Sequence, residues 1–349
     1  MNNMTIFDLV TPENLVQYWT ELHTNDQPLL GETLFPTIRE IGLDISWLKG
    51  STGQPVALRL SAFDSKAIRR DRKGFENYRT EMPFFKESKY IDEKMRQQLN
   101  TLIQTRNQVQ INQILVKIFD DLVELVDAAL VALERMRMEA VTTGTITLAS
   151  NGQAYTYDFD VPTEQKTTVT KSWSDPTADI INDINKIVTD MKAKGVTITR
   201  AICNNSVVED IKKNNNIKNQ IYVLAGGSIS SINSARALSY IYDETGVEIY
   251  SYDNVYVDED GTAVKYVPDD TVVFIPDGTL GNTHMGTTPE ESDLMGSPSS
   301  ATVQIINNGI AVTTHAEHDP VMVETKVSMV ALPSLDRAGD IHILDTEAE

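Results

Sequence analysis

One segment of sixty residues, Phe84 to Thr143, contains neither glycine nor proline. Because these two residues most often interrupt or end helices, a segment that lacks them can remain helical over a long distance. A polar run at 104–108 divides it. On either side, apolar residues recur at steps of three and four, which predicts a shorter helix near 90–103 and a long helix near 109–140. The apolar stripe comprises Ile91, Met95, Leu99, Leu102, Ile111, Ile114, Leu115, Ile118, Phe119, Leu122, Leu125, Val126, Ala129, Leu130, Leu133 and Met136.

The length of the second helix constrains what the chain can fold into. About 32 residues at 1.5 Å per residue span roughly 48 Å, whereas a compact globule of this chain length is only about 52 Å across. We therefore expect a flat or elongated molecule with this helix as its spine. Leu122 and Leu130 should lie on its buried face, and Glu124 should lie in solvent. A heptad coiled coil is the alternative, but the apolar stripe is too wide and too short for one.

The composition is typical of a water-soluble globular chain, with 41% hydrophobic and 23% charged residues and a mean hydropathy of −0.25. No window of the sequence approaches the ~20 apolar residues of a membrane span, so no membrane partner is expected. Cys203 is the only cysteine, which excludes an intrachain disulfide and fits a reducing compartment. The chain length predicts about two domains.

The net charge of −20 is distributed unevenly along the chain. Asp243 to Glu349 holds three basic and 21 acidic residues, a net of 3 − 21 = −18, whereas Arg59 to Lys89 holds nine basic and five acidic residues, a net of 9 − 5 = +4. Direct binding to duplex DNA is not expected, because such proteins normally present a dominant basic face. The acidic half is either a solvated surface or a surface that complements a basic segment in another copy of the chain.

The N-terminal ninety residues predict an arm followed by a projecting loop. Thr11, Pro12 and Glu13 are typical of a helix start, and the predicted helix Pro12–Leu22 is followed by proline-punctuated chain and a short strand at 41–47. Residues 54–89 begin with a strand pattern at 56–60 and then carry a basic cluster. With so little apolar content they cannot form a core of their own, which favours a loop or hairpin.

Beyond the spine, strand and helix patterns alternate. A hairpin is predicted at 145–159 around Asn151-Gly152, a tight-turn dipeptide. An α/β domain should follow, with helices at 177–194, 206–213 and 234–242 and strands at 196–203, 221–224 and 247–252. The predicted elements after it are a hairpin around 258–261, a strand at 271–275, a loop at 278–300, a turn at Asn308-Gly309, and closing strands at 310–314 and 321–332. We expect the closing strands to pair with the 145–159 hairpin.

The sequence contains no motif that identifies a catalytic or cofactor site. Gly226-Gly227-Ser228 follows a predicted strand, but neither the dinucleotide-binding nor the P-loop glycine pattern occurs. Cys203 has no histidine within eighty residues on either side, so a buried structural thiol is favoured over a nucleophile. The basic cluster of the loop lacks the glycine-rich turn into a helix that phosphate sites use. We therefore assign no catalytic or cofactor-binding residue.

Two acidic or histidine-containing runs are weak candidates for metal binding. His315-Ala316-Glu317-His318-Asp319 is the densest run of potential ligands. On a strand the two histidines would face opposite sides, whereas on a turn they could converge on a metal; a polar loop is the alternative. Asp258-Glu259-Asp260-Gly261 resembles the start of a calcium loop but lacks the glutamate at its twelfth position. We assign no metal ligand.

Short motifs follow one another in a recognisable order. They are Leu34-Phe35-Pro36, Phe63-Asp64 with the basic residues after it, Lys171-Ser172-Trp173-Ser174-Asp175-Pro176-Thr177-Ala178-Asp179-Ile180, Val267 to Val273 running on to Leu280-Gly281-Asn282-Thr283, Asp319-Pro320 and Leu332-Pro333. With the arm, loop, spine, α/β domain and closing strands in the same order, the chain resembles the major capsid proteins of tailed bacteriophages. More narrowly, it is similar to the lambda-type capsid protein E family.

The resemblance implies an α+β chain with the Hong Kong 97-like capsid fold. Residues 1–53 would form the N-terminal arm, 54–86 the extended loop, 87–174 with 301–349 the peripheral domain, and 175–300 the axial domain. In that family, hexamers and pentamers of the chain assemble into the icosahedral head shell, which encloses the DNA genome. The protein would belong to the virion and be assembled in the bacterial host cytoplasm.

The resemblance also implies partners and contacts. The loop should contact another copy through Arg69, Arg70, Arg72 and Lys73, because guanidinium groups pair bidentately with carboxylates. Lys66 and Lys73 occupy the loop that some relatives crosslink to asparagine, but no asparagine partner is identified here. Only about fifty residues precede the loop, so we expect a separate scaffolding protein, and aberrant shells without it. A portal protein and a decoration protein are further expected partners.

Two other functions remain open at this point. Residues 175–300 could form the catalytic domain of an α/β enzyme that modifies nucleotides or sugars. The same parts could also build a phage-tail or encapsulin-like assembly protein.

Overall fold

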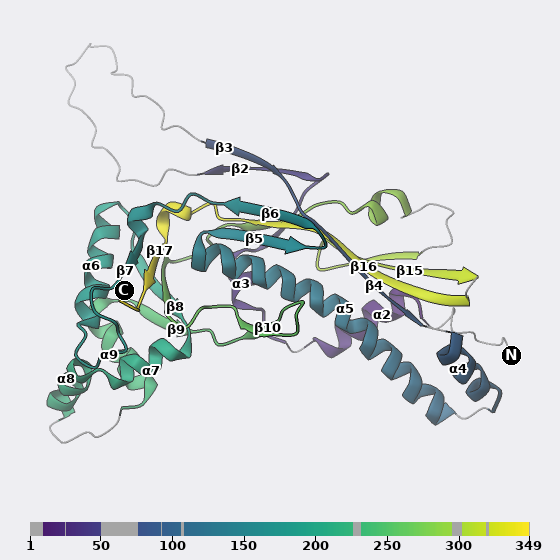
Figure 1. Cartoon of the computed structure of the whole chain (residues 1–349), viewed down its shortest axis with the longest axis horizontal. Coiled ribbons are helices and arrows are strands. Elements are labelled where there is room, and N and C mark those ends of the chain that lie inside the picture. Colours follow the sequence, from purple (N-terminus) through teal and green to yellow (C-terminus); the bar gives the residue numbers. More distant parts are fainter. Residues whose placement is uncertain are drawn as a thin grey trace, which may run out of the picture. The chain divides into compact units, whose positions relative to one another are not determined.

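The computed structural model describes residues 10–24, 26–49, 76–91, 93–105, 108–225, 232–294, 302–318 and 321–348. Figure 1 shows the helices and strands of the chain. Contacts between residues divide it into two units. Unit 1 comprises Met1–Ser46, Arg79–Met136 and Asn282–Ser334, and unit 2 comprises Trp47–Tyr78, Arg137–Gly281 and Leu335–Glu349. The limits predicted for the arm, loop, peripheral and axial domains remain predictions. No helix among the described residues is long and apolar enough to cross a membrane.

The predicted long helix is confirmed as α5, Gln108–Thr143, which runs without interruption for 36 residues. Leu122 and Val126 lie one turn apart on its buried face and are 2% and 0% exposed. Glu124 lies in solvent, as predicted, whereas Leu130 is only half buried. Leu130 therefore marks the border of the apolar stripe rather than its centre.

The shorter helix, α4, spans Glu93–Thr105 and begins later than predicted. The chain before it, Phe84–Ile91, is a strand, β4, so the segment without glycine or proline is not helical from its start. The reason is tertiary: β4 forms an antiparallel ladder with a strand near the C-terminus, and this pairing outweighs the helical spacing of a few apolar residues.

The core of unit 1 is a six-stranded sheet organised around β16, a strand of fourteen residues. One edge of β16 pairs with β15, and the other pairs first with β4 and then with β13. β1 extends the sheet beyond β13, and β14 extends it beyond β15. The strands are β1 (Thr37–Arg39), β4 (Phe84–Ile91), β13 (Asn282–Met285), β14 (Thr302–Ile306), β15 (Ile310–His318) and β16 (Val321–Ser334).

This pairing corrects the predicted partner of the closing strands. We expected them to pair with the 145–159 hairpin, but that hairpin forms a two-stranded sheet of its own in the described part of the chain. The predicted loop at 278–300 likewise contains β13 and a short π-helix, η2 (Glu290–Leu294). Both differences arise because strands pair with partners that are distant in the sequence. Strand periodicity and turn residues do not indicate which strands pair.

Helix α2 packs on the unit 1 sheet and is bonded to α5. α2 (Pro12–Leu22) begins as predicted, with the Thr11 hydroxyl capping it. It packs on β14 and β15, and its Trp19 indole donates a hydrogen bond of 2.9 Å to Asp127 of α5. Lys89 of β4 donates to the Asp121 carbonyl oxygen of α5 over 2.8 Å. The described part of the predicted arm therefore packs on its own subunit.

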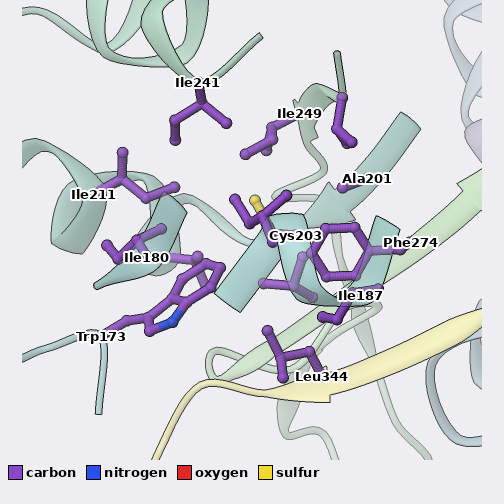
Figure 2. Close-up of a cluster of buried hydrophobic side chains, with 14 of the residues drawn as sticks. Trp173, Ile180, Ile187, Ala201, Cys203, Ile211, Ile241, Ile249, Phe274 and Leu344 are labelled. Atoms are coloured by element: carbon purple, nitrogen blue, oxygen red, sulfur yellow. The ribbon is translucent and has the colours of Figure 1, made fainter. Parts of the chain in front are cut away.

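Unit 2 is a five-stranded sheet with helices, and its core is shown in Figure 2. The strand order is β7-β17-β12-β8-β9, so β17, from the last residues of the chain, enters the sheet beside β12. The strands are β7 (Lys166–Thr168), β8 (Ile198–Cys203), β9 (Glu248–Ser251), β12 (Thr271–Pro276) and β17 (His342–Asp345). The helices are α6 (Ile180–Ala193), α7 (Asn205–Lys213), α8 (Asn215–Ala225) and α9 (Ser234–Thr245).

Helices α6, α7 and α9 and strands β8, β9 and β12 confirm the predicted α/β alternation, with ends shifted by a few residues. The strand predicted at 221–224 is wrong, because these residues belong to helix α8. Ile217 and Ile221, four residues apart, are both buried in the core, which is the spacing of one helix face. A short apolar run does not distinguish a strand from a buried helix segment.

The predicted hairpins at 145–159 and around 258–261 are confirmed. β5 (Thr145–Ser150) and β6 (Gln153–Asp158) are joined by Asn151 and Gly152, whose φ angles of 51° and 75° suit a tight hairpin turn. β10 (Val255–Val257) pairs with β11 (Ala263–Lys265). The remaining elements are β2 (Asp44–Lys49), β3 (Glu76–Glu81), α3 (Leu30–Leu34), η1 (Thr163–Gln165) and η3 (Ala338–Asp340).

The spine yields a stability prediction. Leu122→Ala should lower the free energy of unfolding of the dispersed subunit by ~2–5 kcal/mol, because it leaves a cavity in the core, and Leu130→Ala should cost about half as much. Glu124→Ala should cost at most ~1 kcal/mol, because it removes only an exposed ion pair with Lys89. Denaturant unfolding measures all three. Equal losses at the three positions would show that the helix presents a different face to the core.

Candidate assembly surfaces

The two residues of unit 2 best suited to catalysis are buried and electrically neutral at pH 7. Cys203 is fully buried among apolar side chains (Figure 2), and burial raises the pKa of its thiol to about 12, so only ~1 molecule in 10⁵ carries the thiolate at pH 7. Burial also lowers the pKa of His342 to about 4. The His342 ring bonds Thr167 at 2.8 Å. Both side chains serve packing.

The candidate metal runs form ordinary strand and turn structure. His315 and His318 both lie in β15, and the described residues contain no group of three or more ligands that could hold a metal. Asp258 to Gly261 form the turn of the β10–β11 hairpin, in which the Gly261 amide donates to the Asp258 carbonyl over 2.8 Å. Gly226-Gly227-Ser228 and Asp319 lie outside the described residues.

The four predicted contact residues, Arg69, Arg70, Arg72 and Lys73, lie outside the described residues, as does Lys66. The structure describes the two strands that lead to them, β2 and β3, which pair with each other. It also describes how the chain is held on either side of these strands, at residues 40–43 and 82–83. We call these two segments the neck.

The neck is fastened to the unit 1 sheet by backbone hydrogen bonds. The Met82 amide donates to the Leu43 carbonyl over 2.8 Å, which ties the two neck segments together. The Glu40 amide donates to the Met285 carbonyl over 2.8 Å, and the Thr287 amide donates to the Gly42 carbonyl over 3.3 Å. Sequence analysis missed this attachment, because backbone bonding leaves no side-chain signature.

Gly286 allows the neck to approach the sheet closely. A Cβ atom at this position would lie 2.6 Å from the Gly42 carbonyl oxygen, 2.7 Å from Met82 Cε and 2.8 Å from Val330 Cγ1. Its own amide donates to the Val330 carbonyl of β16 over 2.8 Å. Any side chain here must therefore push the neck away from β16 or break that hydrogen bond.

Polar side chains reinforce the same region. His284 of β13 bonds Glu40 through Nδ1 and Ser334 through Nε2, both at 3.1 Å. Arg39 donates to the Asn308 carbonyl over 2.8 Å and pairs with Glu291 of η2. These contacts join Arg39 and Glu40 to β13, to η2 and to the turn between β14 and β15.

η2 is attached to the sheet by a buried carboxylate. Glu290 pairs with Lys326 at 2.7 Å and accepts a hydrogen bond from Ser328 at 2.8 Å, both on β16. Burial raises the pKa of Glu290, but the bonds from Lys326 and Ser328 outweigh burial and lower the pKa below its usual value. Glu290 is therefore ionised at neutral pH and fixes η2 in place.

Two exposed acidic surfaces are suited to bind a basic segment from another copy. The first, on α5 in unit 1, consists of Asp120, Asp121 and Glu124. The second, at the tip of the β10–β11 hairpin in unit 2, consists of the exposed Glu259 and Asp260 and the half-buried Asp258. We call them the spine patch and the tip patch. In the spine patch, the hydrogen bond from Tyr18 to Asp120 raises the pKa of the phenol.

Comparison with known proteins identifies the family of the chain that carries these surfaces. The family described as phage major capsid protein E matches residues 11–345. The chain belongs to this family. It is thus a phage capsid protein, a structural protein that self-assembles into a shell.

Solved structures show that this capsid protein has the Hong Kong 97-like fold. A prophage protein from Escherichia coli CFT073, which carries a provisional assignment as a capsid protein, is 14% identical with a TM-score of 0.56, covering 95% of this chain and 98% of the other. A phage-related protein from Bordetella bronchiseptica RB50 is 11% identical with a TM-score of 0.54, covering 95% and 96%. No curated protein sequence matches the chain significantly.

The neck yields a second prediction. Gly286→Ala should destabilise the subunit by ~1–3 kcal/mol, because the added methyl group overlaps a backbone oxygen that cannot rotate away. Gly339→Ala is the matched control, because a Cβ there has no atom within 4 Å. Denaturant unfolding compares the two variants. If Gly286→Ala is as stable as the control, the close approach of neck and sheet is not required.

Proposed function

We propose that this capsid protein forms hexamers and pentamers that close into the icosahedral head of a tailed phage and enclose its DNA. The observation that carries the proposal is the family match over residues 11–345, nearly the whole chain. The chain's net charge of −20 fits a role in which DNA is held by enclosure rather than by contact.

Within that shell, the loop reaches a neighbouring copy. The chain from Arg59 to Lys89 is net +4, whereas the spine and tip patches each present three carboxylates. Arg69, Arg70, Arg72 and Lys73 bind one of these patches on the next subunit. The neck supports this proposal, because backbone bonds fix the two described segments on either side of the loop. Each exposed ion pair contributes only ~0–1 kcal/mol, so several are needed per contact.

The alternative of an α/β enzyme in residues 175–300 has no observation in its favour. The single thiol of the chain is buried in the core of unit 2 with a pKa of about 12, which argues against nucleophilic catalysis by it. Family membership supports three further partners: a scaffolding protein that sets shell size, a portal protein, and a decoration protein. It also supports assembly in the bacterial host cytoplasm before incorporation into the virion.

Electron microscopy of the purified chain tests the proposal. Shells, curved sheets or rings of five or six copies are the expected particles. A monodisperse monomer at every protein and salt concentration, with a melting temperature that rises on adding nucleotides or sugars, would instead favour the enzyme.

A charge-reversal experiment tests the loop contact. The triple variant Arg69→Glu, Arg70→Glu, Arg72→Glu should remain folded and soluble but fail to close shells, because small losses repeat at every contact. Wild-type assembly should also weaken with salt, since the Debye length falls to ~3 Å at 1 M. The matched control reverses three exposed lysines elsewhere, Lys94, Lys117 and Lys186, which changes the net charge equally.

Compensating changes then identify the docking patch. In the arginine triple variant, the carboxylates of either the spine patch or the tip patch are replaced by lysine. Only the replacement in the patch that binds the loop should restore shell assembly. If the arginine variant assembles normally, or if the lysine control fails to the same extent, the basic cluster is a solvated loop tip and the docking proposal is wrong.

A further inference from the structure

The two edges of the β5–β6 hairpin differ in how far their backbone groups are bonded. Ser150 and Gln153 flank a two-residue turn, so Gln153, Tyr155 and Tyr157 bond β5, whereas Ala154, Thr156 and Asp158 direct their backbone groups outward. Two outward amides of β5 are occupied: the Thr147 amide donates to Glu139 over 2.9 Å and the Thr145 amide to Thr143 over 3.1 Å. Among the described residues, no strand pairs with the outer edge of β6.

The β6 edge lacks the features that usually prevent strands from pairing. Natural edge strands are protected by lysines, prolines, bulges or a covering element. β6 reads Gln-Ala-Tyr-Thr-Tyr-Asp, with one charge at its end and no proline, and its register with β5 is continuous. All its residues are exposed except Tyr157, which is half buried. A two-stranded hairpin is marginally stable by itself, so a third strand would strengthen it.

Electrostatics favour a second copy of this chain as the source of that strand. The chain has a net charge of −20, so most surfaces of two copies repel each other. Residues 153–157 carry no charge, so this segment can pair with the same segment of a second copy without placing like charges opposite each other. The edge is also self-complementary in geometry. Antiparallel pairing centred on Thr156 places Thr156 opposite Thr156 and each Asp158 opposite Ala154, so all three outward residues are used and the carboxylates stay apart.

We propose that the β6 edges of two copies pair antiparallel across a two-fold axis, forming a continuous four-stranded sheet. The inference rests on the proposed function, because it assigns a contact within the shell. A two-fold contact is isologous, so a single open edge supplies both halves of it.

Paired charges at Thr156 test this directly. Thr156→Lys and Thr156→Glu should each fold like wild type but reduce shell yield by about tenfold or more, because each places like charges opposite one another across the axis. An equimolar mixture of the two should recover the yield, because Lys then opposes Glu. Thr147→Lys is the matched control: Thr147 is exposed and lies opposite Thr156 on the same face, but its amide is already bonded.

Electron microscopy and sedimentation give the shell yields. Normal shells from Thr156→Lys, an equal loss in Thr147→Lys, or a mixture that stays unassembled would each overturn the pairing, and the last result would indicate that a different partner binds this edge. Absence of shells, curved sheets and rings from the wild-type chain would instead contradict the proposed function. If the pairing holds, a mild oxidant should join Thr156→Cys copies by a disulfide in shells but not in dispersed subunits, since Cys203 is buried.

Discussion

Hydrogen bonding along both edges of β16 is the interaction on which unit 1 depends. The strand joins β15 on one side to β4 and β13 on the other, so segments far apart in sequence meet on one ladder. Buried backbone groups must be paired, and the sheet therefore forms as a whole. Two further attachments use the same strand: the Gly286 amide bonds Val330 beside the neck, and Glu290 of η2 bonds Lys326 and Ser328.

The same sheet also holds the neck. The neck segments 40–43 and 82–83 lie on either side of β2 and β3. There, backbone bonds and the close approach at Gly286 fix the two neck segments against β13 and β16. The two contacts that we propose differ in kind: contacts at the acidic patches would vary with salt, whereas backbone bonding would dominate at the β6 edge.

Local sequence patterns predicted the elements whose shape depends on nearby residues. The apolar stripe predicted α5, and Asn151-Gly152 predicted the β5–β6 hairpin. Sequence patterns failed where distant residues determine the secondary structure. β4 is a strand because β16 pairs with it, and 221–224 is helical because Ile217 and Ile221 pack in the same core. The basic residues of the loop were found from charge and lie outside the described chain. The neck and the β6 edge were missed, because both depend on backbone groups.

We infer that the β16 sheet is complete within one subunit, whereas the β6 edge is completed by another copy. Hydrogen exchange of dispersed subunits and of assembled shells tests both halves. The amides of 323–328 should exchange slowly in both states, because β16 is paired on both sides there. The amides of Ala154 and Thr156 should exchange rapidly in subunits and slowly in shells. Rapid exchange along β16 in subunits, or equal exchange of the β6 amides in both states, would contradict the account.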